Sequence, residues 1–239
     1  MEWYPQDKKE LNSILKSFLA EKPKIKQNSI HGIIVPHAGY VYSGKISGKA
    51  YSLLKGKEDS IAIILAPSHY VSLKGIASHN QQSWKTALGS IKVIDSEFPK
   101  QDISSEHAIG NQIPFLQKLG FKKILPLMVG EITKERAEQT AESLTKIKNA
   151  VFIVSTDLSH FLSYEQALKK DKETINAIGN LNSEKLAEAE NSACGAFPLL
   201  ILLEICGLKN WKPKLIEYKN SGDITGDKER VVGYAGFWF

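Results

Sequence analysis

Three histidines follow apolar runs of the sequence, close to the point where each run ends. His37 comes after the run GIIV, His69 after IAIIL and His160 after AVFIV. Short continuous apolar runs are typical of strands that are buried on both faces of a parallel sheet. Ligand sites in open α/β sheets form just beyond the carboxyl ends of the strands. If these strands are parallel neighbours, the three imidazoles meet at one edge of the sheet.

Proline stands between the strand and the histidine in two of these segments, at Pro36 and Pro67. Because proline has no backbone N–H and a fixed φ, it ends the hydrogen-bonded ladder and sets the direction in which the next residues leave the sheet. Neutral imidazole is a common ligand of iron, copper and zinc. We therefore expect His37 and His69 to bind a transition metal. The alternative for each histidine is an ordinary hydrogen bond within a turn.

A third metal ligand is offered by Cys194, in the stretch SACGAFP at 192–198. This cysteine precedes an apolar helix, whose free N–H groups and dipole favour a thiolate. The alternative is a buried structural cysteine, which is how we interpret Cys206 inside the run LLEIC.

Other polar residues near the histidines could act beside a metal. Asp157 lies three residues before His160 and is expected to orient its imidazole, unless it only caps the segment that follows. Glu106 and His107 open a predicted helix. There the carboxylate complements the helix dipole, while His107 either faces the edge of the sheet or caps the helix.

The elements that must position these residues alternate between helices and strands. Helical spacing of apolar residues, caps and small residues predicts helices at 11–19, from 43 onwards, and at 106–119, 134–148, 164–179, 183–190 and 195–206. Strands are predicted at 30–35, 61–65, 123–129, 150–154, 214–219 and 231–239, with weaker signals at 75–77 and 91–94. This order predicts an α/β fold of three layers, α/β/α, with a mostly parallel central sheet. We expect a single domain over residues 1–239.

The composition narrows the choice of partners and compartment. Of the 239 residues, 42% are hydrophobic and 24% are charged, which is typical of a globular protein. The net charge of +5 comes mainly from scattered lysines, which indicates a solvated surface and no nucleic-acid partner. The longest apolar run, at 197–203, is too short to span a bilayer, and two cysteines do not form a disulfide framework. We expect a reduced, cytoplasmic protein without a membrane partner.

Taken together and in this order, the motifs resemble those of the Memo family, named for mediator of ErbB2-driven cell motility. The resemblance rests on WYP at 3–5, PHAGYVYSG at 36–44, LAPSHY at 65–70, EHAIGNQIPFL at 106–116, STDLSHF at 155–161, ACG at 193–195, and NSGDITGD through VVGYAGF near the carboxyl end. That family is similar in fold to class III extradiol dioxygenases, which use a non-haem Fe(II) to cleave catechol rings. The resemblance therefore implies a Memo-like domain with this dioxygenase-like fold.

The resemblance also implies a ligand set. In the Memo pattern the metal ligands correspond to His37, His69 and Cys194, and Asp157 and His160 lie beside them. The dioxygenases hold iron with two histidines and a carboxylate, so here a thiolate replaces the carboxylate. Softer ligation shifts the preference towards Cu(I), Zn or a differently poised iron. We expect one transition metal ion, with Fe(II) or copper ahead of zinc.

One segment departs from the family pattern. Memo-like chains usually carry EHSxE where this sequence has EHAIG at 106–110. Ala108 and Gly110 therefore lack the hydroxyl and the second carboxylate, and any role that those groups support is weakened here.

The first functional hypothesis is a metal-dependent, dioxygenase-like oxidoreductase that acts on a small organic substrate. In it, His160 is the general acid/base and Asp157 orients it. Contacts to the substrate are assigned to Tyr40, Tyr70, His107 and Glu106.

Two alternatives come from other functional classes. The first is a non-catalytic binding or adaptor protein that holds a small-molecule or peptide ligand with an anionic, phosphotyrosine-like group in the cleft, since eukaryotic Memo proteins are associated with signalling and phosphotyrosine-containing partners. The second is a zinc-dependent hydrolase, for which Glu106 is the one acidic residue that could serve as the general base.

Overall fold

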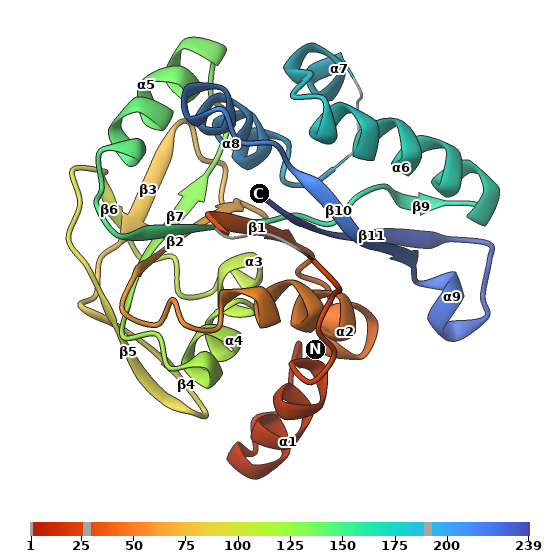
Figure 1. Cartoon of the computed structure of the whole chain (residues 1–239), viewed down its shortest axis with the longest axis horizontal. Helices are drawn as coiled ribbons and strands as arrows, with labels where there is room; N and C mark the ends of the chain where they lie inside the picture. The colour runs from red at the N-terminus through yellow and green to blue at the C-terminus, as the bar shows by residue number, and fades with distance from the viewer. Residues whose placement is uncertain (1, 26–29, 189–192) are drawn as a thin grey trace.

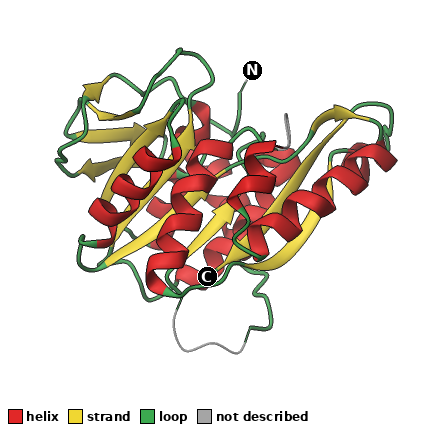
Figure 2. Ribbon diagram, turned by 90° about the horizontal axis from the view of Figure 1, so that it is seen from above, coloured by secondary structure: helices red, strands yellow, loops and turns green. Residues whose placement is uncertain are grey.

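The computed structural model describes residues 2–25, 30–188 and 193–239. Within these ranges an eleven-stranded sheet runs through the middle of the molecule, with helices on both of its faces (Figures 1 and 2). The helices are α1 (Lys8–Phe18), α2 (Tyr40–Tyr51), the 3-10 turn η1 (Ser52–Leu54), α3 (His107–Gly110), α4 (Ile113–Leu119), α5 (Lys134–Thr145), α6 (Tyr164–Gly179), α7 (Ser183–Glu188), α8 (Ala196–Lys209) and α9 (Gly222–Thr225). The strands are β1 (Gly32–Val35), β2 (Ile61–Pro67), β3 (Ile76–His79), β4 (Ser83–Thr86), β5 (Gly89–Val93), β6 (Lys100–Gln101), β7 (Lys123–Val129), β8 (Ala150–Ser155), β9 (His160–Leu162), β10 (Lys214–Asn220) and β11 (Val231–Trp238).

The centre of the sheet is parallel, as the continuous apolar strands predict. The main order is β10-β11-β1-β8-β2-β7-β3-β6. Strands β1, β8, β2 and β7 are parallel to their neighbours in this series, whereas β11 is antiparallel to both β1 and β10 and β3 is antiparallel to β7. The three strands that precede the histidine motifs are therefore neighbours, and their carboxyl ends lie at the same edge.

Two hydrophobic cores fill the space on either side of the sheet. Successive residues of a strand point to opposite faces, so Ile33 and Val35 enter one core while Ile34 enters the other. Helices α1, α2 and α4 cover the first core, and α5, α6 and α8 cover the second, which Figure 1 shows below and above the sheet. The predicted three-layer α/β/α fold is confirmed.

The predicted helix at 106–119 is instead two short helices, α3 and α4, with Asn111 and Gln112 between them. The Asn111 side chain donates a hydrogen bond of 2.6 Å to the carbonyl of His37, and Gln112 donates one of 3.1 Å to the carbonyl of Pro36. Pro114 lies in the first turn of α4, where its missing backbone N–H has no helical partner to lose, so it favours a new helix start there. The break therefore ties this segment to the turn that carries His37.

Several element boundaries also differ from the predictions. Helix α2 begins at Tyr40, three residues early, because the Tyr40 N–H donates to the carbonyl of Trp3 and an extended Gly39 precedes it. The short elements β4, β6, β9 and α9 were not predicted, since each is too short to show a periodic pattern. Helix α7 ends at Glu188 as described, and the predicted continuation over 189–190 lies outside the described residues. No helix in the described part of the chain is long and apolar enough to cross a bilayer.

Candidate metal centre

The carboxyl ends of β1, β8 and β2 bring the predicted ligands together. The ring centroids of His37 and His69 lie 5.1 Å apart, and those of His69 and His107 lie 4.5 Å apart. One ligand atom from each of His37, His69 and Cys194 lies within 4.8 Å of the others. Two imidazole nitrogens and a sulfur at this spacing form a group that could hold a transition metal ion.

Hydrogen bonds around His37 fix which of its ring nitrogens is free. The Ser155 hydroxyl donates its single proton to the carbonyl of Ala108 at 2.7 Å and accepts from the Gln112 amide at 3.0 Å. Its remaining contact, 2.9 Å to His37 Nδ1, must therefore be accepted from the ring N–H. Nε2 then carries the lone pair, and it faces Cys194 Sγ at 3.1 Å. This is the tautomer that a metal ligand needs.

His69 is oriented in the same way by a carboxylate. Glu106 is buried, and its Oε1 lies 2.9 Å from His69 Nδ1 while its Oε2 accepts from the His69 backbone N–H at 2.7 Å. Burial opposes ionisation of this carboxyl, but hydrogen bonds from His107, His69 and the Ala108 N–H outweigh it and hold its pKa well below the usual value. The ionised carboxylate accepts the His69 Nδ1–H and leaves Nε2 free for a metal.

A second cluster, formed by His69, Glu106 and His107, also has its ligand atoms within 4.8 Å of one another. Its polar atoms already have hydrogen-bond partners. His107 Nδ1 lies 3.3 Å from Glu106 Oε1 within the cluster and 2.9 Å from the Tyr70 hydroxyl outside it. The ring of Trp3 stacks on His107 at 4.0 Å. We interpret this cluster as the support of the first site, because its donors and acceptors satisfy one another.

Cys194 lies two residues before α8 and is held against the loop that follows β8. Its Sγ accepts a hydrogen bond of 3.2 Å from the Asp157 N–H, and the Gly195 N–H donates to the Thr156 hydroxyl at 2.9 Å. The helix start, which we expect to favour a thiolate, is opposed by two other influences in the protein alone. Burial, followed by the nearby Asp157 carboxyl, raises the pKa of the Cys194 thiol far above its ordinary value. A bound cation would be needed to form the thiolate.

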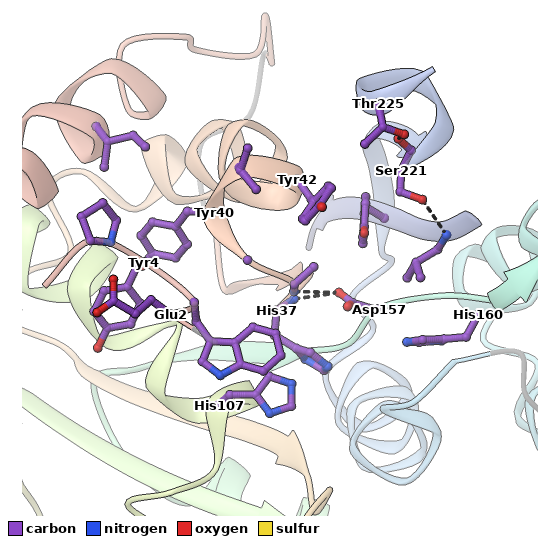
Figure 3. A pocket seen from close by; sticks show the side chains of 18 of the residues that line it. Glu2, Tyr4, His37, Tyr40, Tyr42, His107, Asp157, His160, Ser221 and Thr225 are labelled. Carbon is purple, nitrogen blue, oxygen red and sulfur yellow. Dashed lines mark hydrogen bonds between the residues drawn. The ribbon is translucent and has the colours of Figure 1, made fainter. Parts of the chain in front are cut away.

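Asp157 and His160 lie beside this group and line the same cavity (Figure 3). Asp157 Oδ1 accepts from the backbone N–H groups of His37 at 2.8 Å and Ala38 at 3.3 Å. Among the described residues no hydrogen bond joins Asp157 to the His160 ring, so the expected orientation of His160 by Asp157 is not observed. Instead, Asp157 fixes the turn that carries His37. His160 stands on β9 with its ring towards Asp157.

The cavity has a volume of about 1220 Å³, and His37 and His69 are among its lining residues. Of the predicted substrate contacts, Tyr40 and His107 line it, but Tyr40 is buried and its hydroxyl donates to the Asn111 carbonyl at 2.8 Å. Glu106 and Tyr70 are not among its lining residues; Glu106 is only 2% exposed, and the Tyr70 side chain bonds to His107. Direct contact of Glu106 with a substrate is therefore not supported.

Sequence reasoning missed the residues that orient the ligands. These are Ser155, Asn111 and Gln112, together with Trp3 over His107. All four lie inside the motifs that carry the family resemblance, which was the available signal. Their types gave no chemical reason to single them out, because a serine or an amide beside a strand usually satisfies a turn.

The chain matches one protein family and several curated proteins. Residues 2–238 match the family described as Memo-like protein. A MEMO1 family protein of Aquifex aeolicus is 32% identical over 259 residues, which cover 99% of this chain and 96% of that protein. One of Sulfurisphaera tokodaii is 36% identical, with coverages of 90% and 84%, and one of Methanosarcina mazei is 33% identical, with coverages of 98% and 94%. The chain is thus similar to these proteins over nearly its whole length.

Proposed function

We propose that this chain, which belongs to the Memo-like protein family, is a metal-dependent oxidoreductase whose metal ion is held by His37, His69 and Cys194. The observation that carries the proposal is the pair of oriented imidazoles. Ser155 binds Nδ1 of His37 and the Glu106 carboxylate binds Nδ1 of His69, so both Nε2 atoms are left as ligands. Such hydrogen-bonded partners are typical of metal-binding histidines.

The donor set favours some metals over others. Two imidazoles and a sulfur are softer ligands than two imidazoles and a carboxylate, which favours Cu(I) and zinc over hard cations and remains compatible with Fe(II). Because the proposed reaction needs a redox-active ion and zinc has no redox chemistry, we propose Fe(II) or copper ahead of zinc. A free Cys194 thiol is needed, which supports a reducing, cytoplasmic compartment.

The residues around the site have separate roles in this proposal. When bound, the ion would supply redox chemistry and open coordination positions. His160 faces the cavity from β9 and is proposed as the general acid/base for a substrate held there. Asp157 holds the His37 turn through two backbone N–H groups. Trp3 and His107 form an aromatic wall on which a planar organic substrate could pack.

A binding function is the second candidate, and one observation favours it. The cavity exceeds the ordinary range for small-molecule sites, roughly 300–1,000 Å³, and Val41 and Phe161 at its edge are strongly exposed. A peptide ligand would cover such a surface. Hydrolysis is less well supported, because both oxygens of Glu106, the one acidic candidate base, are occupied by hydrogen bonds.

The first test is the metal content. The protein is loaded anaerobically with Fe(II), Cu(I) or Zn(II) in separate samples, desalted, and measured by elemental analysis beside His37→Ala and Cys194→Ser. We expect about one ion per chain in the parent and a loss in both variants. Cys206→Ser is the matched control, since Cys206 is buried in α8 away from the group. A parent that retains no metal would contradict the oxidoreductase and favour the binding function.

The second test separates metal binding from catalysis. His160→Ala should keep the metal content of the parent and lose oxygen consumption in a screen of catechols and related aromatic substrates, because the histidine lies outside the ligand group. If metal and turnover fall together, the acid/base assignment of His160 is wrong.

A further inference from the structure

A β-bulge lies at the edge of the cavity, in the strand that carries His160. In the pairing of β9 with β11, Leu162 faces Val231 and His160 faces Val232, so Phe161 is an extra residue without a partner in the ladder. Phe161 also has a φ of 60°, in the left-handed region. That region is usual for glycine in bulges and a genuine outlier for a bulky aromatic residue.

The bulge changes where Phe161 points. Neighbouring residues of a regular strand face opposite sides, yet His160 and Phe161 both line the cavity. The Phe161 side chain is 61% exposed, so it gains little from burial in the fold. A strained backbone that delivers an exposed aromatic ring to a cavity is expected where the ring contacts a ligand.

Arg230 completes this end of the cavity. Its Cζ atom lies 5.0 Å from the centre of the Phe161 ring, and it too is a lining residue. No ion pair within the described ranges involves Arg230. A guanidinium that lies over an aromatic ring can still offer N–H donors to a planar oxyanion. The chain has only two arginines, and the other, Arg136, lies on α5 beside a separate pocket.

Ser221 lines the same cavity (Figure 3) and adds a neutral donor close to β9, because it bonds to Val232, the ladder partner of His160. Its hydroxyl oxygen accepts a hydrogen bond of 3.0 Å from the Val232 N–H, which leaves the hydroxyl proton to be donated. The neighbouring Thr225 hydroxyl donates its proton to the Ser221 carbonyl at 3.0 Å and is therefore not a donor for a ligand. Asp227 also lines this end, with Oδ1 accepting from the Glu229 N–H. Its negative charge favours a singly charged ligand group over a doubly charged phosphate.

We propose that Phe161, Arg230 and Ser221 form a subsite for the carboxylate of an aromatic or conjugated acid. The carboxylate pairs with the Arg230 fork and the Ser221 hydroxyl, and the apolar body of the ligand lies against Phe161. The inference rests on the proposed function in one respect: the other end of the same molecule is the part that reaches the metal group. The substrate class is therefore organic acids.

The test compares acids with their amides. The probes are 3,4-dihydroxyphenyl acids with one, two or three methylene groups before the carboxylate, their primary amides, and the phosphate ester of the matching alcohol. Binding is measured by calorimetry with the full chain, both loaded with Zn(II) and as Cys194→Ser without metal. For the best-fitting length we expect the acid to bind about ten-fold more tightly than its amide.

Variants assign this preference to the subsite. Arg230→Gln should bring the ratio of amide to acid dissociation constants to about one, while Arg136→Gln, which changes the other arginine, should keep the parent ratio. Phe161→Gly should weaken binding of acid and amide alike and should not lower the melting temperature, because it relieves the left-handed backbone. A Phe161 that serves only the fold would instead give a clear loss of melting temperature.

The outcomes separate this inference from the proposed function. The subsite is overturned, even if the protein binds metal, by either of two results. One is a parent ratio of amide to acid dissociation constants near one for every methylene chain length, and the other is an unchanged ratio in Arg230→Gln. A ratio that persists in Cys194→Ser supports the subsite even if the oxidoreductase proposal fails. Tighter binding of the phosphate ester than of the acid would overturn the choice of a carboxylate.

Discussion

Nε2 of His37 lies 3.1 Å from Sγ of Cys194, although 157 residues separate the two in the chain. The Nδ1 proton of His37 is directed to Ser155, so Nε2 can only accept. The Asp157 N–H already donates to the sulfur. In the protein alone, the Cys194 thiol therefore donates its proton to Nε2 of His37. A metal ion that binds both atoms must replace this proton.

Metal binding should accordingly release a proton. Because burial and Asp157 raise the pKa of Cys194, the thiol is protonated at pH 7, and Zn(II) should displace about one proton per ion. Calorimetry in two buffers with different ionisation enthalpies measures this number. Cys206→Ser should give the same release, since its thiol lies in α8. Release of no proton by the parent would show that Cys194 does not bind the ion as a thiolate.

Ser155→Ala should weaken metal binding without abolishing it. The substitution removes the acceptor that orients His37. Loss of such a partner typically lowers metal affinity by roughly ten- to 100-fold. Competition with a chromophoric chelator measures the affinity. Ser60→Ala is the matched control, because Ser60 is also buried and hydrogen bonded, to Asn149 at 3.0 Å, but lies at the amino end of β2. Equal affinities in the two variants would contradict the tautomer that we assign.

The sequence was sufficient to predict the layers of the fold and the edge at which the ligands meet. Continuous apolar strands such as GIIV and IAIIL allowed this, because a strand buried on both faces carries no polar alternation to confuse its assignment. The positions of His37 and His69 then followed from the rule that loops at the carboxyl ends of strands form the site. Cys194 came from a different part of the chain, and its place beside His37 was implied by the family resemblance.

The finer geometry could not be predicted, for physical reasons that differ between residues. The break at Asn111 and Gln112 depends on hydrogen bonds to carbonyls about 75 residues earlier, which no local pattern encodes. The state of the Cys194 thiol was predicted from the helix start, but burial dominates its pKa. The bulge at Phe161 is set by pairing with β11 rather than by the turn residues that usually signal one.

Asp171 gives a prediction of pH dependence that does not involve the metal group. This buried carboxyl accepts from the Ser159 N–H at 2.9 Å and from the Tyr218 hydroxyl at 2.7 Å, and burial raises its pKa above the ordinary value of 3.8. The folded state therefore holds the proton more tightly than the unfolded state. Its contribution to stability is full below pH 3.8 and is lost as pH rises through the raised pKa.

Asp171→Asn should remove this dependence. Chemical denaturation of parent and variant at a series of pH values from 3.5 upwards gives the difference in unfolding free energy. We expect the parent to lose stability relative to the variant as pH rises, until the raised pKa is passed. Asp227→Asn, which changes an exposed carboxylate in the loop between α9 and β11, serves as the control. A difference that is constant with pH would show that burial does not raise the pKa of Asp171.

Helix α1 packs against α2, and Gly48 of α2 lies against the backbone of Phe18, the last residue of α1. A Cβ at Gly48 would lie 2.5 Å from the Phe18 carbonyl oxygen and its Cβ. Because backbone as well as side chain would have to move, we expect Gly48→Ala to destabilise the protein by about 1–3 kcal/mol despite the better helix propensity of alanine.

Gly207 in α8 has open space around it, so Gly207→Ala should instead stabilise the protein by up to about 1 kcal/mol. Urea denaturation with a common m-value measures both changes. If Gly48→Ala were as stable as Gly207→Ala, the close approach of α1 and α2 would be contradicted.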